Sequence, residues 1–341
     1  MRVAMWYNNS DVRVQEMPVP EISPKEVLVK VIASGICGSD VLEWYRIKKA
    51  PLVLGHEITG EIVKTGTEVK KYKVGDRVFV SHHVPCNICL YCLNGEHTAC
   101  ETLQKTNFYP GGFAEYLRVP EINVDRGIEV LPEDMSFDDG VFIEPLACIV
   151  RGQRTAGFKP GKTLLVLGSG MAGLLHIALA RVIGMGKIIA TDISEYRLNA
   201  AKEMGADVSI NSKDNVLEAV LKANDGRKAD YIIVSTGAPI AFAQAFECID
   251  KGGTILFFAP NSKGEPVALP INDHWRNGIK MLFSYGGAPN DIQSAITYIR
   301  SKKMPLNKMI THKLPMAEIG LGFKLTAEAK DSIKVIIEPN K

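Results

Sequence analysis

The 341-residue sequence lacks both a long hydrophobic run and a strong net charge. No apolar stretch approaches the roughly 20 residues that a membrane-spanning helix needs. The formal net charge is only +2, which argues against binding to nucleic acid or to an anionic membrane surface. Residues 1–8 contain none of the apolar stretch that a secretory signal requires. We therefore expect a cytoplasmic protein.

The seven cysteines are unevenly placed, and their odd number argues against a disulfide framework in a cytoplasmic chain. Four of them follow the pattern Cys-x2-Cys-x2-Cys-x7-Cys and can surround one tetrahedral ion, most naturally zinc. Four protein ligands leave no open position, so this zinc is expected to be structural. Unligated cysteines and an iron–sulfur cluster are the alternatives, although bacterial ferredoxins have a shorter last gap followed by proline, where Glu101 stands here. The four residues are Cys86, Cys89, Cys92 and Cys100.

The character of the chain changes near Pro145. Before this point, short runs of β-branched residues alternate with glycine and proline, which predicts a β-rich domain. After it, apolar strands alternate with helical patterns, which predicts a doubly wound parallel sheet and hence an α/β fold. The expected strands of this sheet are 163–167, 187–191, 231–234, 254–258 and 280–284, and the expected helices are 171–183, 195–204, 215–222 and 240–248.

The last part of the chain has too little apolar surface to form a domain alone. Two expected helices, 292–300 and 316–325, precede an expected strand at 332–337. We expect this part to return to the first domain. The predicted division is 1–148 for the first domain, 149–285 for the nucleotide-binding domain and 286–341 for the return to the first domain.

A glycine-rich turn follows the first expected strand of the parallel sheet. It reads Gly-Ser-Gly-Met-Ala-Gly from Gly168 and opens an apolar helix, as in dinucleotide-binding proteins. Gly168 permits the tight turn, Gly170 lets the backbone approach a pyrophosphate, and Gly173 allows the helix to pack closely on the strand. The pyrophosphate would lie on the amides at the helix N-terminus, which include those of Met171 and Ala172. An ordinary glycine turn is the simpler alternative, but the strand and helix around it favour a dinucleotide site.

The second expected strand of this sheet ends at Asp192, at about the spacing expected for a residue that binds the adenosine ribose. A carboxylate there accepts hydrogen bonds from the ribose hydroxyls and repels a 2′-phosphate, which favours NAD over NADP. Arg197 could pair with Asp192, stack on adenine or attract a phosphate. Thr236, just after strand 231–234, is a further candidate for cofactor binding.

Three short segments carry other possible zinc ligands, because cysteine, histidine and glutamate all bind this ion. Cys37 begins the run Cys-Gly-Ser-Asp, His56 lies in Gly-His-Glu, and Glu144 precedes Pro145 in Glu-Pro-Leu. Each residue also has a simple structural explanation. Cys37 could be a core residue, His56 a surface histidine, and Glu144 a carboxylate at a helix N-terminus.

Over nearly its full length, the chain resembles the zinc-containing medium-chain alcohol dehydrogenases, and within them the sorbitol (polyol) and threonine dehydrogenases. The resemblance rests on the Cys-Gly-Ser-Asp, Gly-His-Glu and Glu-Pro-Leu runs, the four-cysteine lobe and the glycine turn. It extends to Gly-Asp-Arg-Val at 75–78 and Gly-Phe-Ala-Glu-Tyr at 112–116. Residues 191–198 are similar to the corresponding stretch of threonine dehydrogenases.

The resemblance implies a GroES-like β-rich catalytic domain, split in sequence around a Rossmann domain, with two zinc ions per chain and NAD as cofactor. It places the active site in the cleft between the two domains. By residue-to-residue correspondence, Cys37, His56 and Glu144 bind the catalytic zinc, and the four-cysteine lobe binds the structural zinc. Glu57 is either a transient ligand or a nearby carboxylate.

The implied reaction transfers a hydride between NAD and a polar secondary alcohol or its ketone, with a polyol, sugar alcohol or hydroxy-amino acid as the substrate type. Zinc would lower the pKa of the substrate hydroxyl. Ser39 would be the first proton acceptor, and Asp40 would orient His56. Two departures leave the substrate open: Leu42 replaces a relay histidine that many relatives carry, and Ser284 replaces an arginine of the polyol branch.

Two other classes of protein share parts of this sequence pattern. A zinc-free, NADPH-dependent enone or quinone reductase on the same fold would lack the metal ligands and the four-cysteine lobe. A non-catalytic nucleotide-binding relative would have lost Cys37, His56 or Glu144, and all three are present. The resemblance also implies a homo-oligomer, a tetramer or else a dimer, that joins edge strands of the nucleotide-binding domain.

Overall fold

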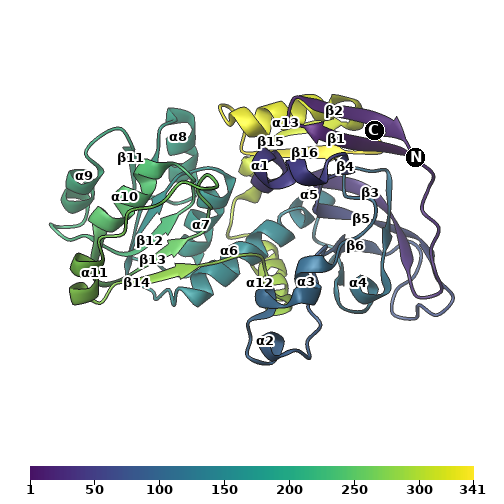
Figure 1. Ribbon diagram of the computed structural model, residues 1–341, viewed down its shortest axis with the longest axis horizontal. Helices are drawn as coiled ribbons and strands as arrows, with labels where there is room; N and C mark the ends of the chain where they lie inside the picture. The colour runs from purple at the N-terminus through teal and green to yellow at the C-terminus, as the bar shows by residue number, and fades with distance from the viewer. The chain divides into compact units, whose positions relative to one another are not determined.

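The computed structural model describes the whole chain, residues 1–341, and it divides into two compact units. Both ends of the chain belong to unit 1 (Figure 1). No helix combines the length and the apolar character needed to cross a membrane. Unit 1 consists of Met1–Ala147, Ala288–Arg300 and Leu306–Lys341, and unit 2 of Cys148–Gly287 and Ser301–Pro305.

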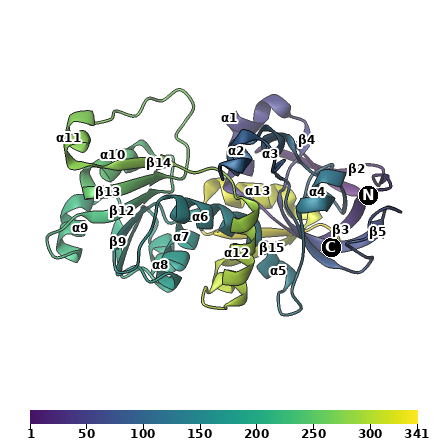
Figure 2. The same ribbon diagram turned by 90° about the horizontal axis from the view of Figure 1, so that it is seen from below.

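Unit 1 is built on two β-sheets. Its strands are β1 (Arg2–Asn8), β2 (Asp11–Glu16), β3 (Val27–Gly35), β4 (Leu52–Val53), β5 (Glu57–Thr65), β6 (Arg77–Val80), β7 (Tyr116–Val119), β8 (Ile128–Val130), β15 (Ile310–Pro315) and β16 (Lys334–Glu338). The larger sheet has the order β15-β16-β3-β5-β6-β8, with β7 also paired to β3, and the smaller has the order β2-β1-β4. The last strand of the chain, β16, therefore pairs with β3 near its start, and Figure 2 shows the C-terminus beside β3.

Short helices join these strands. They are α1 (Glu43–Arg46), α2 (Leu90–Leu93), α3 (Glu101–Lys105), α4 (Glu121–Arg126), α5 (Phe137–Gly140), α12 (Pro289–Arg300) and α13 (Ile319–Glu328), with 3-10 helices at Gly38–Val41, Ile47–Lys49, His97–Ala99, Leu306–Met309 and Met316–Glu318. Helix α6 (Ile143–Thr155) begins in unit 1 and ends in unit 2. It begins two residues before Pro145, where the sequence changes character. Proline is tolerated there because an amide in the first turn of a helix has no intrahelical partner.

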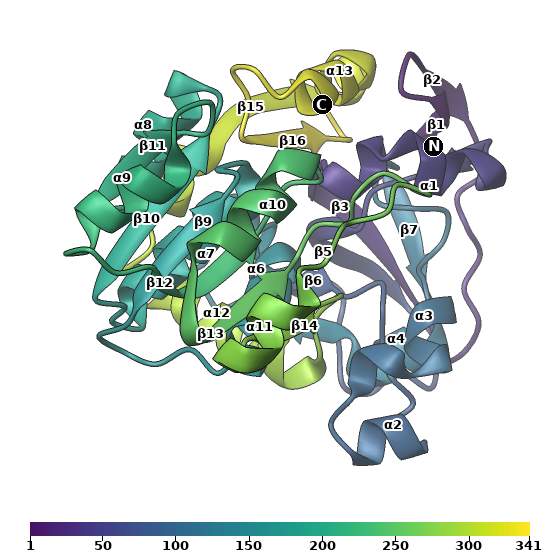
Figure 3. The ribbon, with the colours of Figure 1, turned by 60° about the vertical axis from the view of Figure 1, so that its left-hand side comes forward.

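Unit 2 is an all-parallel six-stranded sheet with helices packed on it (Figure 3). Its elements are β9 (Thr163–Leu167), α7 (Met171–Val182), β10 (Lys187–Asp192), α8 (Glu195–Glu203), β11 (Val208–Asn211), α9 (Val216–Ala223), β12 (Ala229–Val234), α10 (Pro239–Cys248), β13 (Ile249–Phe257), α11 (Ile271–Asn277) and β14 (Lys280–Phe283). The strand order is β11-β10-β9-β12-β13-β14. The GroES-like and Rossmann fold class predicted from the sequence is confirmed.

Strand β9 shows why the sheet needs helices on both faces. Leu164, Leu165, Val166 and Leu167 are all completely buried. Side chains alternate between the two faces of a strand, so an apolar run without alternation must be covered on both. Leu165 and Leu167 pack in one cluster with residues of α9 and α10. Val166 lies under the first turn of α7.

Strand β11 was missing from the sequence prediction. Its four residues, Val-Ser-Ile-Asn, include only one buried side chain, Ile210. It lies at the edge of the sheet, where a strand needs little apolar surface. The sequence therefore carries too weak a hydrophobic pattern to reveal it.

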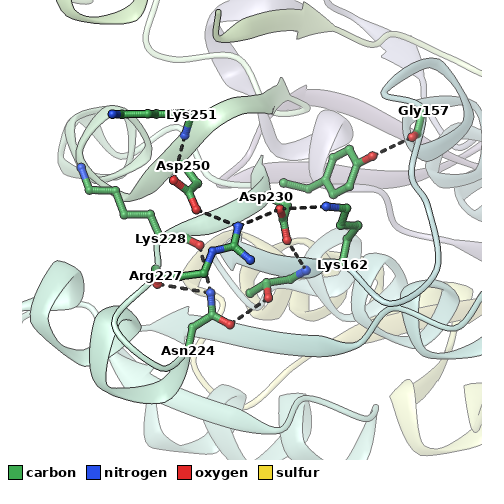
Figure 4. A network of polar contacts seen from close by, with 10 residues as sticks. Gly157, Lys162, Asn224, Arg227, Lys228, Asp230, Asp250 and Lys251 are labelled. Atoms are coloured by element: carbon green, nitrogen blue, oxygen red, sulfur yellow. Dashed lines mark hydrogen bonds and ion pairs between the residues drawn. The ribbon is translucent and has the colours of Figure 1, made fainter. Parts of the chain in front are cut away.

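A polar network joins the amino-terminal ends of three parallel strands in unit 2 (Figure 4). Asp230 of β12 pairs with Lys162, just before β9, and with Arg227, both at 3.4 Å. Arg227 also contacts Asp250 of β13 at 2.9 Å. The cations are well exposed, and such pairs contribute only about 0–1 kcal/mol each. Ligands of open parallel sheets bind at the opposite, carboxyl ends of the strands, so we interpret this network as structural.

Candidate active site and metal centres

The Cys37–Asp40 segment forms a tight turn directly after β3. The Sγ atom of Cys37 accepts a hydrogen bond from the Ser39 amide at 3.4 Å, and the Asp40 carboxylate accepts one from the Cys37 amide at 3.1 Å. These reciprocal bonds cap the short helix at Gly38–Val41. The side chains of Cys37 and Asp40 are thereby fixed relative to the backbone.

Strand pairing brings His56 and Glu57 to this turn. Glu57 begins β5 and pairs with Gly35 at the end of β3. The ligand atoms of Cys37, His56 and Glu57 consequently lie within 4.8 Å of one another. The Oδ1 atom of Asp40 lies 3.4 Å from Nδ1 of His56, as expected for a carboxylate that orients the ring. We call Cys37, His56, Glu57 and Asp40 the Cys37 cluster.

The charges of the Cys37 cluster favour a bound cation. Burial opposes ionisation of Asp40, but the neighbouring His56 and Arg46 hold the pKa of this carboxyl below its usual value. Burial also opposes the charged form of His56. Asp40 and Cys37 outweigh burial and raise the pKa of His56 well above its usual value. A positive charge is therefore stabilised among these donors, and the set of one sulfur, one nitrogen and carboxylate oxygens is one that zinc accepts.

Glu57 has a partner that the sequence analysis missed. Its Oε2 forms an ion pair with Nζ of Lys334 in β16, and both side chains are completely buried. A side chain at Gly35 would collide with Glu57 Oε2, so glycine is needed where the pair crosses β3. The only signal in the sequence is a buried lysine that begins a strand whose next three residues, Val-Ile-Ile, are apolar. The other oxygen of Glu57, Oε1, is buried without a hydrogen-bond partner, which suits an atom facing a bound cation.

Glu144 lies in the first turn of α6 and is half-buried. It belongs to unit 1, like the Cys37 cluster. Its carboxylate is not among the atoms that lie within 4.8 Å of one another there. Its assignment as a zinc ligand therefore stays a prediction, whereas Glu57 is the carboxylate that the structure brings to Cys37 and His56.

The four-cysteine lobe brings its thiols close together. The sulfur of Cys92 lies 3.9 Å from that of Cys86 and 3.5 Å from that of Cys89, and the sulfurs of Cys100 and Cys86 are 3.6 Å apart. Four thiolates at the usual zinc–sulfur distance of about 2.3 Å would be separated by about 3.8 Å in a tetrahedron. An iron–sulfur cluster would place several atoms between the thiolates and hold them farther apart. The geometry therefore fits a single ion.

The glycine turn has the shape expected of a dinucleotide site. Gly168 has φ of +93°, a conformation that favours glycine. A side chain at Gly173 would collide with the carbonyl oxygen of Gly168, so the first turn of α7 can pack closely only with glycine there. Met171 is the first residue of α7 and Ala172 the second. The predicted turn, with Gly170 just before the helix, lies at the carboxyl end of β9.

The other predicted cofactor residues lie around this turn. Asp192 is the last residue of β10. Its carboxylate accepts hydrogen bonds at 2.9 Å from the backbone amides of Ser169 and Ser194. Nη1 of Arg197 lies 3.9 Å from where a Cβ of Gly170 would be, so the guanidinium is close to the glycine turn. The Cβ of Thr236 lies 2.9 Å from where a Cβ of Gly168 would be. All of them lie in unit 2.

Comparison with known families matches both units. Residues 23–126 match the alcohol dehydrogenase GroES-like domain, and residues 172–301 match the zinc-binding dehydrogenase domain. The chain is 30% identical over 353 residues to sorbitol dehydrogenase of Bacillus subtilis, covering 100% of this chain and 98% of the relative. The chain belongs to the zinc-containing medium-chain alcohol dehydrogenases.

Within this family the chain falls in the branch of polyol and threonine dehydrogenases. It is also 33% identical over 333 residues to L-threonine 3-dehydrogenase of Bacillus licheniformis, covering 95% of this chain and 94% of that one. The protein is therefore an oxidoreductase that acts on CH–OH groups of alcohols or polyols.

Solved structures agree with this placement. An alcohol dehydrogenase from Escherichia coli CFT073 in complex with NADH superposes with a TM-score of 0.89 at 27% identity, covering 99% of both chains. A protein from Sinorhizobium meliloti 1021 bound to NADP superposes with a TM-score of 0.88 at 26% identity, again over 99% of both chains. The two differ in the nicotinamide cofactor that they hold.

Proposed function

We propose that this enzyme oxidises a polar secondary alcohol to its ketone with NAD, and that it carries two zinc ions with separate roles. The observation that carries the proposal is the convergence of Cys37, His56 and Glu57 within 4.8 Å, apart from the closed four-cysteine lobe. A zinc-free reductase has no use for such a donor set. A relative without a catalytic metal would gain nothing from an Asp40 carboxylate that orients the ring of His56.

Different residues of unit 1 have different roles in the proposed reaction. When bound, zinc supplies the Lewis acidity that lowers the pKa of a substrate hydroxyl, and NAD supplies the hydride acceptor. Cys37 and His56 hold the ion, with Glu144 as the third ligand and Glu57 as an additional carboxylate. Asp40 fixes the ring of His56. Ser39 accepts the hydroxyl proton, and its Oγ is held in place by a hydrogen bond from Arg46 at 3.1 Å.

The preference for NAD rests on Asp192. Its carboxylate is largely buried and held by two backbone amides, so it cannot easily turn away from a ribose. A 2′-phosphate would bring a second negative charge against it. Arg197 lies near the glycine turn, where it would contact the dinucleotide phosphates or adenine. Gly168, Gly170 and Gly173 would hold the pyrophosphate at the N-terminus of α7.

We further propose a cytoplasmic homo-oligomer, a tetramer or else a dimer. Strand β14 lies at the edge of the unit 2 sheet, and edges of this kind invite pairing with a second copy. Phe283 at the end of β14 and Trp275 in the preceding α11 are each 80% exposed, which is unusual for large apolar side chains. A mass measurement by sedimentation tests this, and a monomer would contradict it.

Metal analysis and a cofactor comparison test the function together. We expect two zinc ions per chain and oxidation of secondary alcohols with a kcat/KM for NAD at least about tenfold above that for NADP, since one charged hydrogen bond is worth about 1.5–3 kcal/mol. A chain that holds one zinc and oxidises no alcohol would overturn the proposal. A clear preference for NADP would overturn the role given to Asp192 alone.

A further inference from the structure

The segment that follows Asp40, residues 41–49, carries three cationic side chains and one acidic side chain, and the acid is hydrogen-bonded to another part of the chain. Arg46 ends α1, and Lys48 and Lys49 follow in the 3-10 helix at Ile47–Lys49. Both lysines are exposed, and neither has an ion pair in the structure. Glu43, the only acid between Asp40 and Lys49, accepts a hydrogen bond from the Asn9 amide at 3.1 Å. Two positive charges are therefore left without a partner.

Arg46 connects these cations to the reacting centre. It donates to the carbonyl oxygen of Ser39 at 3.2 Å and to its Oγ at 3.1 Å, and its Nη2 lies 3.8 Å from Asp40 Oδ1. Its guanidinium stacks over the ring of Tyr45 at 4.7 Å. Only 19% of the side chain is exposed. A group bound by this guanidinium would lie beside the hydroxyl that Ser39 is proposed to deprotonate.

Two further histidine side chains, those of His82 and His83, lie next to the Cys37 cluster. The ring of His82 lies 4.8 Å from that of His56 and 3.8 Å from that of His83. Burial, together with the charges of His56, Arg46 and Lys49, lowers the pKa of His83 to about 4. Burial and the same kind of charge repulsion lower the pKa of His82 well below its usual value. Arg46 and Lys49 are therefore both close enough to His83 for their charges to act on it.

We propose that the substrate alcohol carries an anionic group, a phosphate ester or a carboxylate, which binds at Arg46, Lys48 and Lys49 while its hydroxyl lies at the Cys37 cluster. A planar guanidinium recognises phosphate and carboxylate oxygens through paired hydrogen bonds, and lysines add point charges. A neutral polyol would leave these cations without a partner. The inference rests on the proposed function, because it assumes that the Cys37 cluster holds the reacting hydroxyl.

Matched substrate pairs test the inference on the zinc-loaded enzyme at saturating NAD. Sorbitol is compared with sorbitol 6-phosphate, and 2,3-butanediol with 3-hydroxybutyrate. The effects of a phosphate and of a carboxylate on kcat/KM are thus measured separately. We expect at least one anionic member to exceed its neutral partner about tenfold or more in kcat/KM, with a KM that rises with salt. Higher kcat/KM for both neutral members would overturn the proposal.

The double variant K48Q/K49Q removes the unpaired charges without touching Ser39. We expect KM for the anionic substrate to rise about 10- to 100-fold, with kcat and the KM for NAD unchanged, since charged hydrogen bonds contribute about 1.5–3 kcal/mol. Lys64→Gln is the matched control, because Lys64 is also an exposed lysine of unit 1 without an ion pair. A rise in KM for NAD instead, or an equal rise for neutral and anionic members, would overturn the assignment.

A binding measurement separates this inference from the proposed function. Isothermal titration of the enzyme with sorbitol 6-phosphate is expected to show binding that K48Q/K49Q weakens about tenfold or more and that sorbitol lacks. If no alcohol is oxidised but this difference remains, the proposed function fails and the anion site stands. If alcohols are oxidised but the double variant binds the phosphate as tightly as the parent, the anion site fails alone.

Discussion

The four-cysteine lobe and the Cys37 cluster are built on opposite principles. In the lobe, four donors of one kind come from a single stretch of about 15 residues, and the only buried residues of the local cluster are Cys92, Cys100 and Leu103. Neighbouring side chains such as Ile88 and Leu93 are more than 70% exposed. In the Cys37 cluster, three kinds of donor come from two segments, the turn after β3 and the start of β5, which the pairing of these strands brings together. We therefore expect the lobe to depend on a bound ion for its fold, whereas strand pairing and hydrogen bonds position the Cys37 cluster.

If the lobe is a structural metal site and the Cys37 cluster a catalytic one, as we propose, the difference indicates where each kind of site obtains its rigidity. A closed site can be local, because the metal itself organises the chain. A site that keeps a position open for substrate has fewer ligands to organise it, so the fold must do so. Here the fold does this through the cap between Asp40 and Cys37 and the buried pair of Glu57 with Lys334.

Removing a donor from the Cys37 cluster should have the largest effect on turnover. For Cys37→Ala or His56→Ala we expect kcat to fall at least about 1,000-fold, because a Lewis acid contributes several kcal/mol to the transition state. Zinc content should fall by one equivalent per chain, with little change in the melting temperature. Cys248→Ala is the control, since this buried cysteine of α10 belongs to neither metal group. Full activity in either variant would falsify the assignment.

Removing a donor from the lobe should act on stability instead. For Cys100→Ala we expect the loss of the other zinc and a destabilisation above about 4 kcal/mol, the range reached when a structural metal is lost. Hydrogen exchange should show the opening confined to the lobe, α2 and α3, at temperatures where the rest of unit 1 stays protected. Molecules that remain folded should still turn over substrate. If Cys100→Ala abolished kcat while the lobe stayed protected, the two roles would be reversed.

Removing the cation from the buried pair tests how the fold supports the Cys37 cluster. Lys334→Met removes the cation paired with buried Glu57, and removing one partner of a buried ion pair costs about 3–5 kcal/mol. The double variant Glu57→Gln/Lys334→Met should recover most of this loss, as measured by urea unfolding of the zinc-loaded protein. Additive losses in the double variant would show that the pair is not coupled. Zinc in the four-cysteine lobe should be retained throughout.

The sequence revealed these two sites unequally, for a physical reason. The four cysteines are close in sequence, so their spacing alone indicates a tetrahedral site. Cys37 and His56 are brought together by the pairing of β3 with β5, which no local pattern records, and only the resemblance to a family joined them. The parallel sheet was predictable because its strands are continuously apolar, while the edge strand β11 was not. Lys334 lies 277 positions from Glu57, and the lysine beside the apolar run Val-Ile-Ile was the only sign of their pairing.

The smallest effect should come from the residue that orients a ligand without binding the metal. For Asp40→Asn we expect the zinc affinity of the Cys37 cluster to fall about 10- to 100-fold, because His56 loses the carboxylate that fixes its ring. Competition with a chromophoric chelator should show one zinc released more readily and the other released as in the parent. Asp230→Asn is the matched control, since this carboxylate is also hydrogen-bonded to a backbone amide but lies in unit 2. Release of both ions at parental concentrations of chelator would show that the capped turn alone holds His56, and that the fold supports the catalytic site without help from Asp40.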